Sequence, residues 1–221
     1  MIRKVLIAED HESANISVQK TLEDLGVKEI DYVYYCDDAL LRIEHGLKTE
    51  RSYDLLITDL YFEQDYRAQR ISGGIALVTA ARQAQPELKV LVFSAENKPA
   101  VIDSLFRNQN IDGYVRKARN DARELKSAIE KISRNEQHYP KQVADMLRHQ
   151  NSHNFTDFDV TIISLLAQGT PQKNIPDYLR RHNIKPAGLS SVEKRLSQIK
   201  TVFEFSKNEQ LVAFCKDMGI I

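Results

Sequence analysis

Two hydrophobic patterns alternate along the first 130 residues of the chain. Short apolar segments rich in β-branched residues predict five strands, at Lys4–Ala8, Asp31–Tyr35, Leu55–Thr58, Lys89–Phe93 and Gly113–Val115. Apolar residues recur at helical intervals in four groups: Val18, Leu22, Leu25; Ala39, Leu40, Ile43, Leu47; Ile75, Val78, Ala81; and Leu125, Ile129, Ile132. Fully apolar strands alternating with helices are typical of a parallel sheet covered on both faces. Residues 1–133 are therefore expected to form an α/β domain, a doubly wound five-stranded parallel sheet of the flavodoxin-like type.

From residue 154 onward the apolar spacing is helical only, and it predicts a small all-α domain over residues 154–221. Gly169 is expected to end the first helix, and Thr170 with Pro171 to begin the second. A capping box at Ser190–Glu193 predicts the start of the third helix. Pro176 falls inside the second predicted helix, where it should bend the axis.

Residues 134–153 separate the two predicted domains. They are polar, are interrupted by Pro140 and contain one amphipathic stretch, Val143–Leu147. This pattern predicts a linker with a short helix.

Composition excludes several classes of protein. The chain has 221 residues, of which 42% are hydrophobic and 28% charged, as in ordinary globular proteins. No run approaches the roughly 18 apolar residues of a membrane span. Cys36 and Cys215 lie too far apart in sequence for a disulfide framework or a zinc motif, so a reducing cytoplasm is expected. Residues 1–125 carry 17 basic and 21 acidic side chains, and residues 126–221 carry 14 and 10, which indicates two modules with different partners.

Polar side chains follow four of the five predicted strands. Glu9 and Asp10 follow the first strand, Asp59 the third, Ser94 the fourth and Lys117 the fifth. The carboxyl ends of parallel strands meet at one edge of a sheet, so these side chains should converge. Clustered carboxylates suit Mg²⁺, and the lysine and hydroxyl suit a phosphoryl group. A carboxylate in such a site can act as a nucleophile and form an aspartyl-phosphate.

Residues 1–130 resemble the receiver domain of two-component response regulators. The resemblance is carried by Val5–His11, Leu55–Leu60, Val90–Ala95 and Gly113–Lys117. It implies that Asp59 accepts a phosphoryl group from a partner histidine kinase.

The same resemblance implies the roles of the surrounding groups. Glu9, Asp10, Asp59 and the backbone carbonyl of Tyr61 would hold Mg²⁺. Lys117 would pair with a phosphoryl oxygen and Ser94 would move to bind another, while Tyr114 would turn inward as a switch.

Two features depart from the receiver pattern. A long polar loop, Tyr61–Gly73, precedes Gly74, and Glu63 stands where the family usually has proline. The proline that commonly follows the lysine is replaced by Ala118. A longer loop can slow phosphate loss or exclude phosphodonors, but surface loops tolerate insertions, and we favour an inert insertion.

The C-terminal domain resembles the LuxR/NarL-type helix-turn-helix. Phe155–Gly169 looks like its opening, Val192–Phe203 like its recognition helix, and Leu211–Ile221 like the closing helix, which usually forms the dimer contact. The resemblance implies DNA contacts at five positions. Lys194, Arg195 and Gln198 would face bases, with Lys185 and Lys200 nearer phosphates.

Two departures weaken the second resemblance. The turn Arg180–Leu189 is expanded, and Glu193 occupies an outward position that is often basic in the family.

From the two resemblances together we expect a cytoplasmic, non-enzymatic response regulator whose phosphorylation at Asp59 controls dimerisation, sequence-specific DNA binding and transcription. The alternatives are a phosphorylation-switched adaptor that binds protein, a DNA binder independent of phosphate, and a hydrolase built on the same carboxylates.

Overall fold

The computed structural model of the protein describes residues 2–141, 143–144 and 154–221. The chain folds as two compact units, the first containing most residues up to Lys141 and the second containing the helices that follow. Each unit is described by itself.

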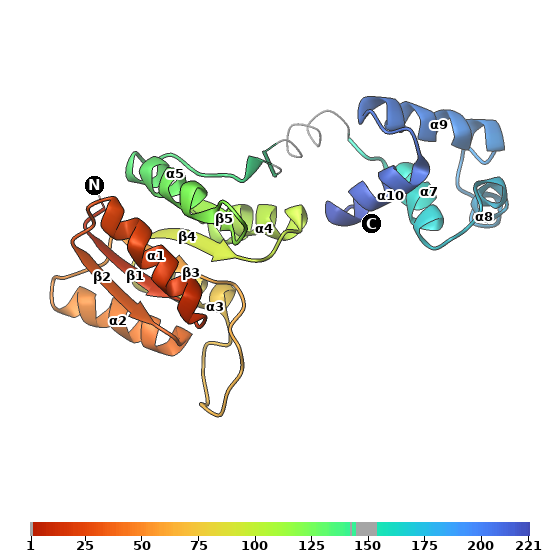
Figure 1. Ribbon diagram of the computed structural model, residues 1–221. Coiled ribbons are helices and arrows are strands. Elements are labelled where there is room, and N and C mark those ends of the chain that lie inside the picture. The colour runs from red at the N-terminus through yellow and green to blue at the C-terminus, as the bar shows by residue number, and fades with distance from the viewer. Residues whose placement is uncertain (1, 142, 145–153) are drawn as a thin grey trace. The chain divides into compact units, whose positions relative to one another are not determined.

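The first unit is built on a five-stranded parallel sheet (Figure 1). Its strands, in the order β2-β1-β3-β4-β5, are β1 (Lys4–Ala8), β2 (Glu29–Val33), β3 (Leu55–Thr58), β4 (Lys89–Ser94) and β5 (Gly113–Arg116). The helices between and after them are α1 (Glu12–Asp24), α2 (Cys36–Lys48), α3 (Gly74–Ala84), α4 (Pro99–Gln109) and α5 (Asp121–Ser133).

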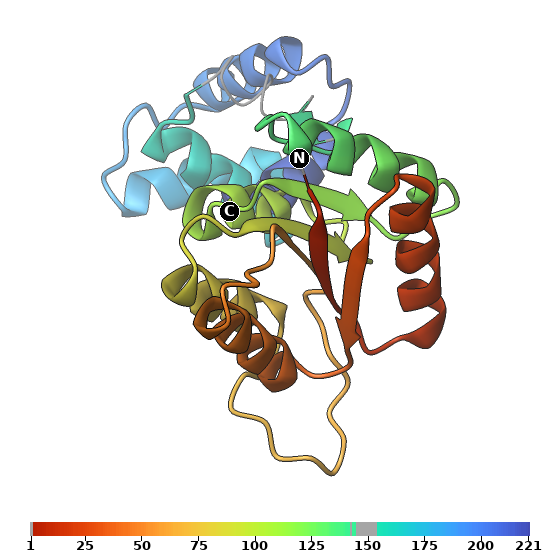
Figure 2. The ribbon, with the colours of Figure 1, turned by 90° about the vertical axis from the view of Figure 1, so that its left-hand side faces the viewer.

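Helices cover both faces of this sheet (Figure 2). On one face, α1 and α5 pack together over a core that includes Val5, Ile57 and Phe93. On the other, α2 and α3 pack over a core that includes Leu6 and Leu56. Successive residues of one strand thus enter opposite cores, which is why the strands are apolar throughout. The predicted doubly wound α/β fold is confirmed.

The second strand lies two residues earlier than predicted. It pairs with β1 from Lys4↔Glu29 to Ala8↔Val33, so its length follows that of its five-residue partner. Tyr35 instead precedes the first turn of α2. The predicted apolar stripes also shift slightly, because Leu47 and Ile75 are exposed whereas Gly46 and Leu77 are buried.

The start of the predicted linker packs on the first unit instead of leaving it. Tyr114 donates its N–H to the carbonyl of His138 at 3.0 Å, and His138 donates to the carbonyl of Asp112 at 3.0 Å. The ring of Tyr139 stacks on Phe106 of α4, with centroids 3.8 Å apart. Residues 136–139 therefore cover the open edge of β5, which apolar spacing alone did not indicate. Most of the helix predicted at Val143–Leu147 lies outside the described residues.

The second unit is a small helical domain. Its elements are α7 (Asp157–Ala167), a 3₁₀ turn η1 (Gln172–Asn174), α8 (Ile175–Arg181), α9 (Leu189–Val202) and α10 (Asn208–Asp217). They enclose one apolar core that includes Ile162, Leu179, Leu196 and Leu211.

Helix boundaries in this unit confirm one predicted signal and correct three others. The helix expected to begin at Thr170 and Pro171 starts instead as the 3₁₀ turn at Gln172, and α8 begins at Ile175. Gly169 adopts a left-handed conformation (φ +84°) just after α7, as a glycine at a helix C-terminus does. Pro176 lies in the first turn of α8, where its missing N–H removes no helical hydrogen bond, so the predicted bend is wrong. The capping box at Ser190–Glu193 is also wrong, because α9 begins at Leu189 after Gly188, without a side-chain cap.

An ion pair between the buried Asp159 and the half-buried Arg195 joins α7 to α9. Arg195 donates from Nε and Nη2 to the two carboxylate oxygens of Asp159, at 2.6 and 2.7 Å. Asp159 is fully buried and also accepts the backbone N–H of Thr156 at 2.9 Å. Burial alone would raise the pKa of Asp159, but the bonds from Arg195 and Thr156 outweigh it and lower that pKa. Arg195, which was predicted to face bases, thus directs its Nε and Nη2 toward Asp159, while 31% of its side chain stays exposed.

We expect His138 to make the stability of the first unit dependent on pH. Burial and nearby Lys131 lower its pKa, although Glu124 acts in the opposite sense. Because the pKa of His138 is lower in the folded chain, the unfolded chain takes up the proton first as the pH falls through about 6.5. The stability that this histidine contributes is complete above that pH and declines as the pH falls below it.

We expect the free energy of unfolding of His138→Gln to fall less than that of the wild type between about pH 7.5 and about pH 5.5, measured by urea unfolding.

His45→Gln, which changes an exposed histidine of α2, is the matched control and should follow the wild type. Equal losses in His138→Gln and wild type would contradict the prediction.

Arg195→Ala should destabilise the second unit by about 3 kcal/mol, because it leaves the buried Asp159 carboxylate without its countercharge. Hydrogen exchange of the α7–α10 amides in the full chain measures this loss. The exposed neighbour Lys194, replaced by alanine, should change the same amides by less than about 0.5 kcal/mol. If the two variants behaved alike, the ion pair would not have the stabilising role assigned to it.

Candidate functional site

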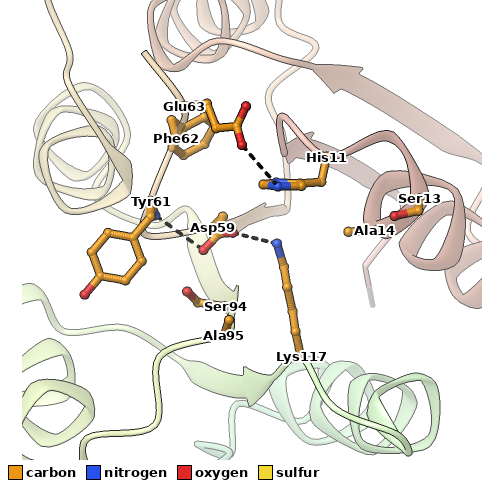
Figure 3. Close-up of a pocket in the computed structure, with 10 residues that line it drawn as sticks. All are labelled: His11, Ser13, Ala14, Asp59, Tyr61, Phe62, Glu63, Ser94, Ala95 and Lys117. Atoms are coloured by element: carbon orange, nitrogen blue, oxygen red, sulfur yellow. Dashed lines mark hydrogen bonds and ion pairs between the residues drawn. The ribbon is translucent and has the colours of Figure 1, made fainter.

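Side chains from four strand ends converge at the carboxyl edge of the sheet (Figure 3). Lys117, just after β5, places its Nζ 2.7 Å from Glu9 Oε2 and 2.5 Å from Asp59 Oδ2. Ser94, the last residue of β4, lines the same pocket. The pairings of β1, β4 and β5 with their neighbours bring these distant residues to one edge, as the sequence analysis expected.

The cluster is largely withdrawn from water. Glu9 is 2% exposed and Asp59 is 5% exposed. Burial raises the pKa of Glu9, although the hydrogen bond and charge of Lys117 act against it. Burial also disfavours the charged form of Lys117, but its bonds to Asp59 and Glu9 outweigh this and raise its pKa. One ammonium group thus neutralises part of the charge of two buried carboxylates.

The donor set fits a hard divalent cation. Oxygen or nitrogen atoms of Glu9, Asp10, His11 and Asp59 all lie within 4.8 Å of one another. Carboxylate oxygens are the ligands that Mg²⁺ prefers. His11 directly precedes α1, and its Nδ1 lies 2.9 Å from Asp10 Oδ1. The position of His11 directly after Glu9 and Asp10 is the sequence feature that could have placed it in this cluster.

The same edge also fits a phosphoryl group. A cavity of about 380 Å³ opens over Asp59, with Ser94 and Lys117 among its lining residues. The Ser94 hydroxyl is buried and has no hydrogen-bond partner among the described residues. A buried hydroxyl without a partner is costly unless a ligand supplies one.

Backbone contacts orient the Asp59 carboxylate. Its Oδ1 accepts the N–H of Leu60 at 2.5 Å, while Oδ2 accepts from Lys117. Gly74 packs directly against the Asp59 backbone, where a Cβ would lie 1.9 Å from the carbonyl oxygen. The chain can therefore return beside Asp59 only at a glycine.

Tyr114 is turned inward. The ring is fully buried, and its hydroxyl donates to the carbonyl of Glu96 at 2.7 Å. Because Glu96 lies two residues after Ser94, this bond connects β5 to the chain that leaves the cavity.

The long loop Tyr61–Gly73 is tied to the start of α2. Asp37 accepts the N–H groups of Arg70 and Ile71, each at 2.9 Å, and Arg67 pairs with Asp38 through both terminal nitrogens. At the other end of the loop, Glu63 donates its N–H to Asp10 Oδ2 at 2.6 Å. Sequence reasoning missed this last contact, although replacing the family's proline with any other residue restores an N–H.

The predicted DNA-contacting residues have different surroundings. On α9, Lys194 and Gln198 are exposed and Lys200 is half-buried, while Lys185 is exposed in the preceding turn. Arg195 pairs with Asp159 and 31% of its side chain is exposed, so its base contact stays a prediction. Within the described ranges, no helix combines the length and apolar character needed to cross a membrane.

Known proteins resemble the chain in sequence. Residues 5–130 match the family model described as the response regulator receiver domain. The transcriptional regulatory proteins RcsB of Escherichia coli K12 and Salmonella typhimurium are each 24% identical over 182 residues, covering 80% of this chain and 80% of theirs.

Solved structures share the fold. A Salmonella typhimurium RcsB structure, described in terms of conformational dynamism for DNA interaction, superposes with a TM-score of 0.60 at 19% identity, covering 98% of this chain and 99% of that one. A structure of two RcsB dimers bound to two parallel DNAs gives the same values. The isolated Salmonella RcsB receiver domain, solved with the phosphomimetic BeF₃⁻, gives a TM-score of 0.53 at 22% identity, covering 66% and 98%. With the family match spanning more than half of its length, the chain belongs to the response regulators that carry a receiver domain.

Proposed function

We propose that Mg²⁺-dependent phosphorylation of Asp59 by a histidine kinase controls dimerisation and sequence-specific DNA binding of this response regulator, and thereby transcription. The observation that carries the proposal is the pair of salt bridges from Lys117 to the buried carboxylates of Glu9 and Asp59. They lie beside the Ser94 hydroxyl, which has no hydrogen-bond partner among the described residues. In a receiver domain, this arrangement provides a nucleophile, a cation and a hydrogen-bond donor at one point.

Phosphorylation would proceed by attack of an Asp59 carboxylate oxygen on the phosphorus of a phosphohistidine. An oxygen–phosphorus bond forms as the nitrogen–phosphorus bond breaks, and the histidine leaves with the bonding electrons. Lys117, already within 2.5 Å of Asp59, would pair with a phosphoryl oxygen, and Ser94 would donate to another. Glu9, Asp10, Asp59 and the Tyr61 carbonyl would hold Mg²⁺, which neutralises phosphoryl charge when bound.

The switch would pass through the chain after β4. If Ser94 moves toward the phosphoryl group, the carbonyl of Glu96 moves with it, and that carbonyl holds the Tyr114 hydroxyl. Tyr114 would therefore sense phosphorylation, and its backbone N–H already contacts residues 136–139 after α5.

DNA recognition would use the exposed side of α9. We assign Lys194 and Gln198 to base contacts and Lys185 and Lys200 to phosphates, supported by their exposure and by the likeness to RcsB solved with DNA. Homodimerisation, through the family's usual contact at Leu211–Ile221, would place two α9 helices on adjacent half-sites.

The adaptor remains the second candidate. Glu193 is exposed beside Lys194, and Arg195 is held by Asp159, so α9 offers fewer cations to DNA than the sequence suggested. A diverged helical domain with such a surface could bind protein instead of DNA.

Phosphoramidate with Mg²⁺ should add one phosphoryl group to the wild type, detected by intact mass. We expect no adduct on Asp59→Asn, and none on the wild type in excess EDTA. Asp24→Asn, at an exposed aspartate near the end of α1, is the control and should label normally. Persistent labelling of Asp59→Asn would place the phosphoacceptor elsewhere.

Genomic DNA selection with Mg²⁺ and beryllofluoride should enrich a few sequences, and fewer or none without beryllofluoride. Lys194→Ala and Gln198→Ala should each weaken binding to the enriched sequence by about 1–3 kcal/mol. Lys185→Ala should reduce the slope of the logarithm of the binding constant against the logarithm of salt concentration by about one, without relaxing sequence preference.

Lys20→Ala, exposed on α1, is the control for the loss of a positive charge. Absence of enrichment by the folded protein under both conditions would favour the adaptor.

A further inference from the structure

We propose that the backbone N–H of Glu63 positions the Asp10 carboxylate for Mg²⁺, so that the long loop Tyr61–Gly73 sets the affinity of the site for the metal. The inference rests on the Mg²⁺ site of the proposed function. It assigns a role to a residue that departs from the family's pattern and that contributes no ligand itself.

Each oxygen of Asp10, which lies two residues after β1, has a nitrogen atom within hydrogen-bond distance. Glu63 N lies 2.6 Å from Oδ2, and His11 Nδ1 lies 2.9 Å from Oδ1. Two such contacts on opposite oxygens fix the rotation of the carboxylate plane. Each carboxylate oxygen offers two acceptor positions, so each keeps one for a cation. Hydrogen bonds to ligating carboxylates orient them and strengthen metal binding.

The contact depends on the identity of residue 63. The family usually has proline at this position, and proline has no N–H to donate. Glu63 supplies the donor, and the bond it makes spans 53 residues of sequence, from the loop to the segment just after β1.

The rest of the loop holds this donor in place before any metal arrives. Phe62 and Ile71 pack against the core beneath α2 and α3. Asp37 accepts the N–H of Arg70 and of Ile71, and Arg67 pairs with Asp38. The loop is therefore held by contacts with α2 and the core that do not depend on the cation.

The side chain of Glu63 is a weaker candidate for the same role. It is 84% exposed, and its Oε1 lies 3.8 Å from His11 Nε2. An ion pair so open to water contributes little. Backbone and side chain can be separated, because glutamine keeps the N–H and removes the charge, whereas proline removes the N–H.

The test is calorimetric titration of Mg²⁺ into the full-length wild type, Glu63→Pro and Glu63→Gln. We expect Glu63→Pro to weaken Mg²⁺ binding by about tenfold or more, and Glu63→Gln to stay within about threefold of the wild type. Ala68→Pro places a proline at an exposed position of the same loop and should bind Mg²⁺ like the wild type.

The outcomes separate the two proposals. If the wild type binds no Mg²⁺, the proposed site fails, and this inference with it. If the wild type and Glu63→Pro bind equally, only the inference fails. Equal weakening in Glu63→Pro and Glu63→Gln would assign the effect to the side-chain charge and overturn the role of the N–H.

A measurement on the wild type guards against misfolding of the proline variant. The Glu63 amide, followed by NMR, should exchange slowly with solvent and should become more protected when Mg²⁺ is added. A Glu63 amide that exchanges as freely as an exposed one with Mg²⁺ bound would overturn the proposal.

Discussion

Charge compensation at the carboxyl edge of the sheet is the constraint on which the first unit depends. Glu9 and Asp59 are buried at the ends of neighbouring apolar strands, where two ionised carboxylates repel each other strongly. Lys117 arrives from β5 and contacts both. A parallel sheet makes this possible, because strands far apart in sequence end at the same edge. The fold therefore holds two carboxylates and one ammonium group together at a site where a divalent cation and a phosphoryl group can bind.

The loop after β3 shows how an insertion can become part of such a site. A loop of this length would be mobile if nothing held it. At the start of α2, however, Asp37 accepts two of its N–H groups and Asp38 pairs with Arg67. The hydrogen bonds from the N–H groups of Arg70 and Ile71 lower the pKa of Asp37 and so favour the ionised carboxylate that accepts them. Gly74 then lets the chain return against the backbone of Asp59. The loop is thus fixed at both ends of its path, one of them at the candidate metal site.

In the second unit, one ion pair decides which side of α9 is available to a partner. Asp159 is buried in α7, and an unpaired charge there would be strongly destabilising. Arg195 satisfies it, and the side chains left exposed on α9 include Glu193, Lys194 and Gln198. The surface available for binding is accordingly less basic than the sequence of this helix suggests.

Local pattern was enough to determine much of this protein. Apolar segments and helical spacing identified five strands, the sheet type and the helical second unit. The residues at the strand ends, from Glu9 to Lys117, identified the candidate site, because each needed only its own strand to be located. Tertiary structure alone decided the bounds of β2, which follow its pairing with β1, and the packing of residues 136–139 on β5. It also decided that Arg195 turns inward and that the Glu63 N–H reaches Asp10. The periodicity of apolar residues predicts which side chains are buried. A hydrogen bond or ion pair between distant segments forms only once the fold has brought its two partners together.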